Sequence, residues 1–154
     1  MDSDQAKLIT ELWIARTAES YPQHASALAS KEPDPFRNPV RANMRQGLSR
    51  LLAELFSEMD STAIDSALDP IIRLQAVQGA TPDDTVRFVT LLKPILHELA
   101  PTLDLETLHA RIDHLAVIAV NKYGQCREQL SRIRANEVHR TSYVLQRIHA
   151  RRPA

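Results

Sequence analysis

Glycine, cysteine and aromatic residues are scarce in this sequence of 154 residues. Only three glycines occur, Gly47, Gly79 and Gly124, and so few glycines disfavour tight turns between strands and favour helices. The same scarcity excludes glycine-rich phosphate-binding loops, because neither GxGxxG nor GxxxxGK can be written with glycines at these positions. The single cysteine, Cys126, excludes an internal disulfide.

Long apolar runs are also missing. No stretch approaches the ~20 residues that a membrane-spanning helix needs, and the N-terminus lacks the pattern of a signal peptide. Together with the lone cysteine, these absences predict a cytoplasmic protein. Charge of both signs is present in equal amount, 19 basic and 19 acidic residues, but it is unevenly distributed. Residues 122–154 contain eight Lys or Arg and two Glu, whereas residues 1–121 contain 11 and 17. A basic C-terminal segment therefore follows an acidic body.

Apolar residues recur at helical spacing through most of the chain, and no alternating β pattern appears. This predicts an all-α, single-domain helical bundle, with a globin-like arrangement as one option. In the first helix, Leu8, Leu12 and Ala15 share a face, with Ile9 and Trp13 beside them, and Pro22 ends the helix. In the fourth helix, Pro94 predicts a kink. The five predicted helices cover about residues 4–20, 39–58, 62–77, 82–99 and 104–150.

Three helix starts carry recognisable capping residues. Asn38 precedes Pro39, and proline suits the first helical position because no amide donor is needed there. Thr81 precedes a proline and two carboxylates, which favour the positive end of the helix dipole. Asp104 can cap the last helix. Between the first two helices lies a proline-rich segment that also contains Phe36, and we expect this aromatic ring to fill an apolar gap between those helices.

The last helix is unusually long. About 45 helical residues would span ~67 Å, roughly twice the ~30–35 Å of a domain of this size. Its apolar stripe has a period close to 3.6 and does not drift around the helix. One interpretation is that the helix extends past the body and that a second copy of the chain covers the stripe. The competing interpretation is a break at Gly124 that folds the tail back. The predicted interaction residues are Tyr123, Cys126, Leu130, Ile133, Val144, Leu145 and Ile148.

Residues able to perform chemistry are few. His97-Glu98 opens like a zinc-protease motif, but Pro101 stands where the second histidine belongs. His109 and Asp113 lie one turn apart without a third ligand nearby, so no metal site is expected. His97 is a weak candidate for a haem ligand. Cys126 falls on the apolar stripe, where a structural thiol is the default. We therefore expect no catalytic residue, no cofactor and no enzyme activity.

Seven arginines between residues 127 and 152 make nucleic-acid binding worth weighing. They are spread around the helix, whereas a nucleic-acid contact needs a row of cations on one side. Two of the helix's own residues, Glu128 and Glu137, can pair with several of them. A solvated or partner-facing helix is the preferred interpretation, and nucleic-acid binding by this segment is the weaker alternative.

Several short motifs occur in the order seen in a known family. They are WIAR at 13–16, SYP at 20–22, FRNPV at 36–40, GLSRLL at 47–52, LDPIIRLQAVQ at 68–78 and TPDDTVRFVTLLK at 81–93. This pattern resembles the RsbRD N-terminal domain family, the sensory domain of RsbT co-antagonist, RsbR-like proteins. The run YGQCREQLSRIRANE at 123–137 is similar to the tail of stand-alone copies. The motif residues singled out are Trp13, Arg16, Phe36, Asn38, Pro39, Arg73 and Gln78.

The resemblance implies a signalling module. In RsbR-like proteins this domain is a dimeric, globin-like helical sensor that lacks haem, and its last helix leads into an output domain, usually a phosphorylatable STAS domain. Residues 101–154 leave no room for a STAS domain or a kinase. We therefore expect a sensory core at 1–121, a basic extension of its last helix at 122–154, a homodimer, and an unidentified protein partner. A haem-binding or small-ligand-binding protein is the alternative.

Overall fold

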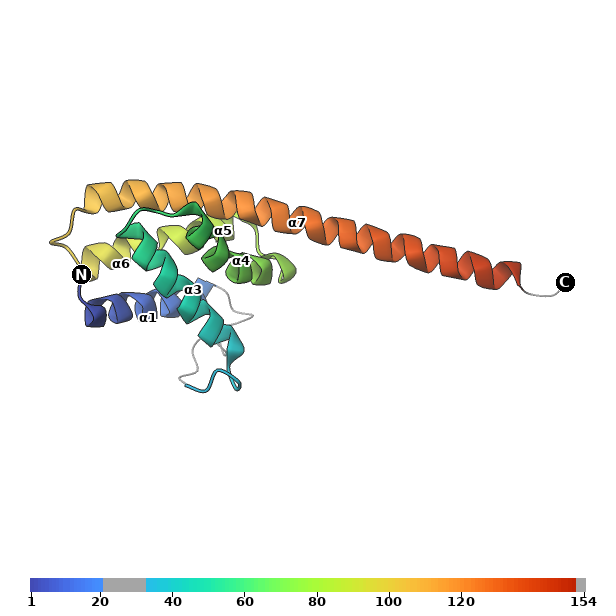
Figure 1. Cartoon of the computed structure of the whole chain (residues 1–154), viewed down its shortest axis with the longest axis horizontal. Helices are drawn as coiled ribbons and strands as arrows, with labels where there is room; N and C mark the ends of the chain where they lie inside the picture. The colour runs from blue at the N-terminus through green and yellow to red at the C-terminus, as the bar shows by residue number, and fades with distance from the viewer. Residues whose placement is uncertain (21–32, 152–154) are drawn as a thin grey trace.

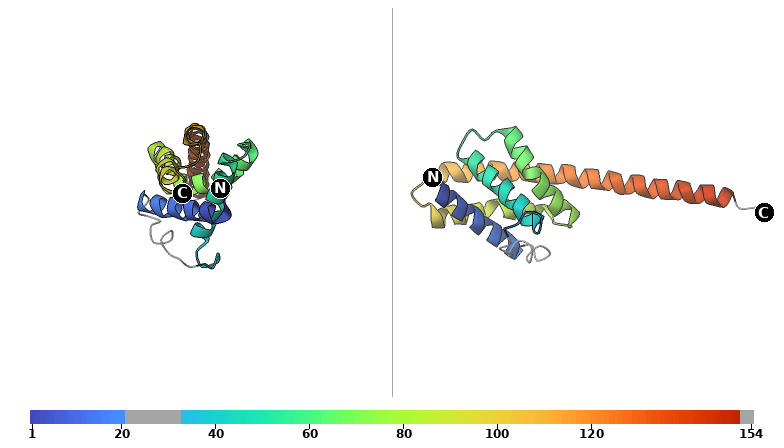
Figure 2. Two further views of the ribbon diagram at one scale, coloured as in Figure 1. Left: turned by 90° about the vertical axis from the view of Figure 1, so that its left-hand side faces the viewer. Right: turned by 60° about the horizontal axis from the view of Figure 1, so that its bottom comes forward.

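The computed structural model describes residues 1–20 and 33–151, and this part of the chain consists of helices and their connections (Figure 1). The all-α prediction is thus confirmed. Five helices gather around the first half of the last helix, whose second half projects from the body by itself (Figures 1 and 2). In chain order the helices are α1 (Ser3–Ser20), α3 (Pro39–Leu55), α4 (Ser61–Val77), α5 (Pro82–Thr90), α6 (Leu92–Leu99) and α7 (Leu105–Ala150).

The three predicted capping residues all begin helices. The side chain of Asn38 accepts a hydrogen bond from the Arg41 amide at 3.1 Å, with Pro39 in the first turn. At α5, the Asp84 amide donates to the Thr81 hydroxyl and the Thr81 amide donates to the Asp84 carboxylate, which is a complete capping box. Asp104 accepts from the Thr107 amide at the start of α7. These side chains satisfy backbone donors that a helix leaves without internal partners.

The predicted fourth helix is in fact two helices, α5 and α6, which meet at Leu91. The sequence predicts a kink at Pro94, whereas the break lies three residues earlier. Proline has no amide hydrogen for the carbonyl four residues before it, and its ring crowds that carbonyl. The carbonyl belongs to Thr90, the last residue of α5. The proline therefore acts one turn upstream of its own position.

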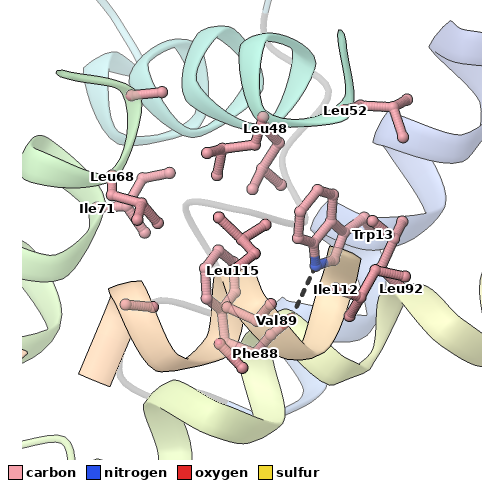
Figure 3. Packing of buried hydrophobic residues seen from close by; sticks show 14 of the residues in the cluster. Trp13, Leu48, Leu52, Leu68, Ile71, Phe88, Val89, Leu92, Ile112 and Leu115 are labelled. Carbon is pink, nitrogen blue, oxygen red and sulfur yellow. Dashed lines mark hydrogen bonds between the residues drawn. The ribbon is translucent and has the colours of Figure 1, made fainter. Parts of the chain in front are cut away.

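A single apolar core joins the helices of the body. Trp13 is fully buried at its centre and stacks on Phe88, with 5.5 Å between ring centroids, while its indole N–H donates to the Phe88 carbonyl at 2.9 Å (Figure 3). The contact fastens α1 to α5. Our assignment of the inner face of α1 was partly wrong, because Leu8 is exposed and the buried face is that of Ile9 and Trp13.

Helices α3 and α4 approach each other closely at Gly47. A methyl group added there would lie 2.7 Å from Ile71 Cδ1 and 3.0 Å from the Ala67 carbonyl oxygen. The second atom belongs to the backbone, so it cannot move aside as a flexible side chain would. Glycine thus allows the two helices to pack closely at this position.

The prediction that Phe36 fills a gap between the first two helices is wrong. Its side chain is 96% exposed. The Asp34 carboxylate accepts from the Phe36 amide at 2.9 Å, and the Asp34 carbonyl accepts from the Arg37 and Asn38 amides. This turn leads the chain into α3 without bringing the ring into the core. The predicted end of the first helix at Pro22 lies outside the described residues.

Candidate functional site

Helix α7 divides into a part that packs on the body and a part that does not. The first part buries one face against α4, α5 and α6, down to Tyr123 and Cys126. Leu130 is half-buried. From residue 131 to residue 151 every residue is exposed, and we call this segment the arm. The helix is continuous through Gly124, so the alternative in which the tail folds back at that glycine is wrong.

The arm carries a row of large apolar side chains in water. Ile133, Val144, Leu145 and Ile148 are each about half exposed, and they follow Leu130 along the helix. The steps from Leu130 to Ile133, from Ile133 to Val144 and from Val144 to Ile148 are three, eleven and four residues. Those spacings keep the side chains on one face of a helix. Contiguous apolar surface of this kind is uncommon on monomers, whose exposed apolar side chains are mostly scattered singly.

The apolar row of the arm continues the face with which α7 packs on the body. Leu108, Ile112, Leu115, Ala119 and Cys126 form the buried row in the body, and Leu130, Ile133 and Ile148 extend it at the same helical spacing. A period near 3.6 residues keeps such a row straight along the helix. The side of α7 that meets α4 and α5 is therefore the side that is uncovered in the arm.

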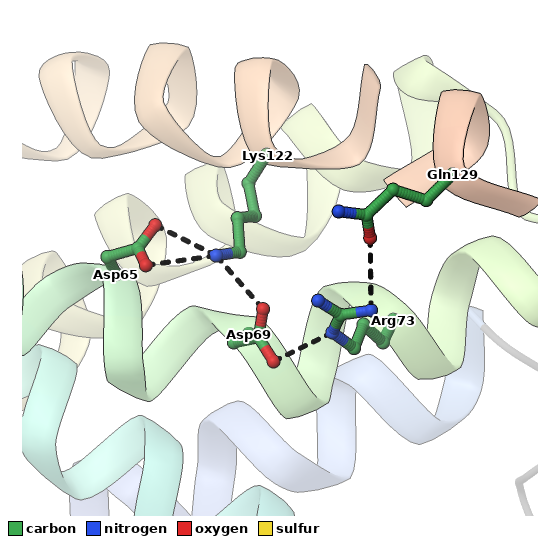
Figure 4. A network of polar contacts seen from close by, with 5 residues as sticks. All are labelled: Asp65, Asp69, Arg73, Lys122 and Gln129. Atoms are coloured by element: carbon green, nitrogen blue, oxygen red, sulfur yellow. Dashed lines mark hydrogen bonds and ion pairs between the residues drawn. The ribbon is translucent and has the colours of Figure 1, made fainter. Parts of the chain in front are cut away.

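A polar cluster joins α7 to α4 just before the arm begins, and we call it the anchor: Asp65, Asp69, Arg73, Lys122 and Gln129 (Figure 4). The Lys122 ammonium lies 2.9 and 3.0 Å from the two Asp65 oxygens and 2.9 Å from Asp69. Arg73 donates to Asp69 at 2.8 Å and to the Gln129 side chain at 3.2 Å. Two basic and two acidic groups thereby fix the register of α7 on α4.

The charges of the anchor shift one another's pKa values. The hydrogen bond from Arg73, with help from Lys122, lowers the pKa of Asp69. Burial on its own would lower the pKa of Lys122, but the hydrogen bonds with Asp65 and Asp69 more than offset this and raise it. At neutral pH Asp69 and Lys122 are therefore both charged and form an ion pair that is partly shielded from water.

Two further contacts join α7 to the body just before the arm begins. The Tyr123 hydroxyl donates to the Ala80 carbonyl in the connection between α4 and α5, and Arg127 donates to the Ala76 carbonyl at 3.4 Å. Cys126 is buried beside them, and this burial raises the pKa of its thiol, which makes the thiol unreactive.

The motif residues named from the sequence lie in separate places and do not form one pocket. Trp13 is in the core, Arg16 pairs with Glu98 on α6 at 2.5 Å, and Gln78 ends α4. Asn38 and Pro39 start α3. Arg73 bonds to Gln129 of α7 and so belongs to the anchor. Trp13, Arg16 and Arg73 join neighbouring helices, and the role of the whole set as a family signature stays a prediction.

The histidine proposed as a haem ligand points to solvent. His97 is exposed near the end of α6, so a group bound to its imidazole would lie at the surface of the helical body. Within residues 1–20 and 33–151, no three His, Cys, Asp or Glu side chains gather closely enough to hold a metal ion. Over the same residues, no helix is both long and apolar enough to cross a membrane.

The anchor was missed by sequence analysis, although part of its signal was present. Asp65, Asp69 and Arg73 repeat at intervals of four on one face of α4, the spacing of neighbouring charges on a helix. That row indicates a charged stripe but not its partner. Lys122 lies 57 residues beyond Asp65, and only the packing of α7 on α4 brings the two together.

The fold and the arm define a helical domain whose last helix leaves the body and leaves an apolar row uncovered. A profile of a known family, the RsbT co-antagonist protein rsbRD N-terminal domain, matches residues 8–138, most of the chain. The protein belongs to this family of signalling domains, which confirms the resemblance found in the motifs. Comparison with curated proteins and with solved structures gave no match.

Proposed function

We propose that this protein is a non-catalytic regulatory module of a bacterial signalling complex, similar to a stressosome, in the cytoplasm. It acts through protein–protein contacts, as a dimer, and α7 is both the dimer contact and the output element. The helical body of residues 1–121 is the sensory part, and residues 122–154 form the extension that reports its state.

The observation that carries this proposal is the uncovered apolar row of the arm. In water such a row costs free energy for every large side chain that it leaves exposed, at about 25 cal/mol per Å² of apolar surface. Most of the stability of a helix in a protein also comes from packing its apolar face on another surface. A surface that covers the row removes the cost of exposure and supplies this packing. The membership of a signalling family agrees with a contact surface rather than an enclosed active site.

The anchor gives the body a way to act on the arm. Lys122 precedes Ser131, the first residue of the arm, by about two and a half helical turns, and its ammonium is held by two carboxylates on α4. A ligand or partner that shifts α4 must break or re-form these ion pairs, and α7 is rigid enough to carry the change along its length. Helix α7 then has two positions relative to the body, and the ligand or partner signals by favouring one of them.

The test is the mass of the protein in solution. Multi-angle light scattering at micromolar concentration should give the mass of two chains. Val144→Glu places a charge in the apolar row and should give one chain, because a buried unpaired carboxylate costs several kcal/mol. Gln146→Glu, on the opposite face of the same turn, is the matched control and should stay dimeric. A wild-type monomer would contradict the proposal.

A further inference from the structure

We propose that the arm of a second copy covers the arm in antiparallel orientation, centred near residue 139, so that each arm ends against the partner's body. This orientation rests on the proposed dimer contact through the arm. The antiparallel orientation specifies which residues of the two arms contact each other. Three features of α7 support it: the side on which its apolar row lies, the symmetry of that row, and its length.

The first feature excludes parallel pairing through the apolar row. That row lies on the side of α7 against which α4 and α5 pack. Paired helices run 8–10 Å apart. A parallel partner covering the arm in register would continue alongside residues 105–126, through the space that α4 and α5 occupy. In an antiparallel pair, the partner's body instead lies beyond the far end of the arm, where nothing obstructs it within the described residues (Figure 1).

The second feature is that the apolar positions of the row are nearly symmetric about residue 139. Leu130 and Ile148 are equally far from residue 139, so antiparallel pairing about that point sets each against the other. Ile133 then lies within one residue of the level of Val144 of the second copy, on the same side of the contact between the two helices. The period of the row, close to 3.6, suits straight helices packed side by side more than a left-handed supercoil.

Charge favours the same orientation. Glu137 lies within the apolar row, and one helical turn away on its flank lies Arg140. About residue 139, Glu137 of one arm lies level with Thr141 of the other and one residue, about 1.5 Å along the helix, from Arg140, twice by symmetry. In parallel register, Glu137 would face Glu137, and Arg134 would face Arg134. Like charges set against each other at a helix contact destabilise it, whereas opposite charges stabilise it.

The third feature is the match of lengths. Pairing about residue 139 brings residue 151, just past the end of α7, level with residue 127 of the other copy. That is where the body stops covering α7, since Cys126 is buried and every described residue from 131 on is exposed. The last residue of α4, Val77, is 60% exposed at this place. Each arm thus spans the whole uncovered length and ends beside Val77 of its partner.

Disulfide trapping in the full chain tests the orientation. In a Cys126→Ala background, Ile133→Cys and Val144→Cys are made separately, with tags of different size, and oxidised alone and as a mixture. We expect a cross-link between the two variants when mixed and little within either alone. In antiparallel register two Ile133 positions are separated by about 12 residues, or ~18 Å along the helix, and a disulfide requires Cα atoms within about 7 Å.

Arg132→Cys mixed with Gln146→Cys is the matched control, because these positions share the register but face solvent, and they should not cross-link. Cross-links within each single variant would show parallel arms and overturn the proposal. A light-scattering dimer without any arm cross-link would also overturn it, by placing the contact on another surface. A monomer in light scattering would contradict the proposed function as well as the orientation. A dimer whose arms cross-link within each single variant would contradict the orientation alone, so the two failures can be distinguished.

Discussion

Lys122 of the anchor offers the most informative single substitution in the body. Lys122→Met keeps the apolar stem and removes the charge that joins α7 to α4. The lysine side chain is only 12% exposed, but Asp65 and Asp69 are 58% and 33% exposed, so water weakens each pair. A partly exposed ion pair contributes about 0.2–1 kcal/mol, and a charge-assisted hydrogen bond in a drier place about 1.5–3 kcal/mol.

For two such contacts, with Asp69 still held by Arg73, we expect a loss of about 1–2 kcal/mol in the free energy of unfolding. In a domain of this size that corresponds to a fall in Tm of roughly 2–8 °C. The assay is urea unfolding followed by circular dichroism at one fixed protein concentration. Arg132→Met is the control, because the exposed pair of Arg132 with Glu128 one turn away contributes at most about 0.5 kcal/mol. Equal effects of the two substitutions would refute the role of the anchor.

The anchor also has a definite pH dependence. The lowered pKa of Asp69 means that its contribution is present above the carboxylate's ordinary pKa and is lost as pH falls through the lowered value. The raised pKa of Lys122 means that its contribution is present at neutral pH and is lost as pH rises through the raised value. The stability difference between wild type and Lys122→Met should therefore be constant near neutral pH and shrink below about pH 4.

Three further substitutions test the packing, each by urea unfolding. Trp13→Phe should cost about 2–4 kcal/mol, because it leaves a cavity and removes the hydrogen bond to the buried Phe88 carbonyl; a neutral result would mean that the stack on α5 contributes little. Phe36→Ala should change stability by no more than about 0.5 kcal/mol, since the ring is exposed, and a large loss would show that the ring is buried in solution. Gly47→Ala should cost about 1–3 kcal/mol through overpacking against the Ala67 carbonyl, whereas a gain in stability would contradict the close approach of α3 and α4.

Local features of the fold could be predicted because they depend on neighbouring residues alone. Asn38, Thr81 and Asp104 cap helices through side chains that reach an amide three residues ahead, and such a contact is visible in the sequence. The continuous apolar row of α7 likewise predicted a helix that extends past the body. The position of the break near Pro94 was less accurate, since a proline acts on the carbonyl one turn before it.

Features that depend on distant parts of the chain could not be predicted in the same way. Phe36 is apolar and follows two prolines, but only the turn held by Asp34 decides that its ring stays in solvent. Lys122 has no acidic neighbour on its own helix that identifies it as an anchor, because its partners Asp65 and Asp69 belong to α4. Which side of α7 is left uncovered in the arm could also be determined only from the packing of α4 and α5 on that helix.

Hydrogen exchange of the arm amides measures most directly whether another surface covers the arm. If two arms pair, the amides of residues 131–151 should be protected at micromolar concentration, and Val144→Glu or strong dilution should remove that protection. The amides of the buried half of α7 should remain protected throughout and serve as the internal reference. Rapid exchange of the arm at every concentration, equal in wild type and Val144→Glu, would show a helix that no partner copy covers and would contradict the proposed role of the arm.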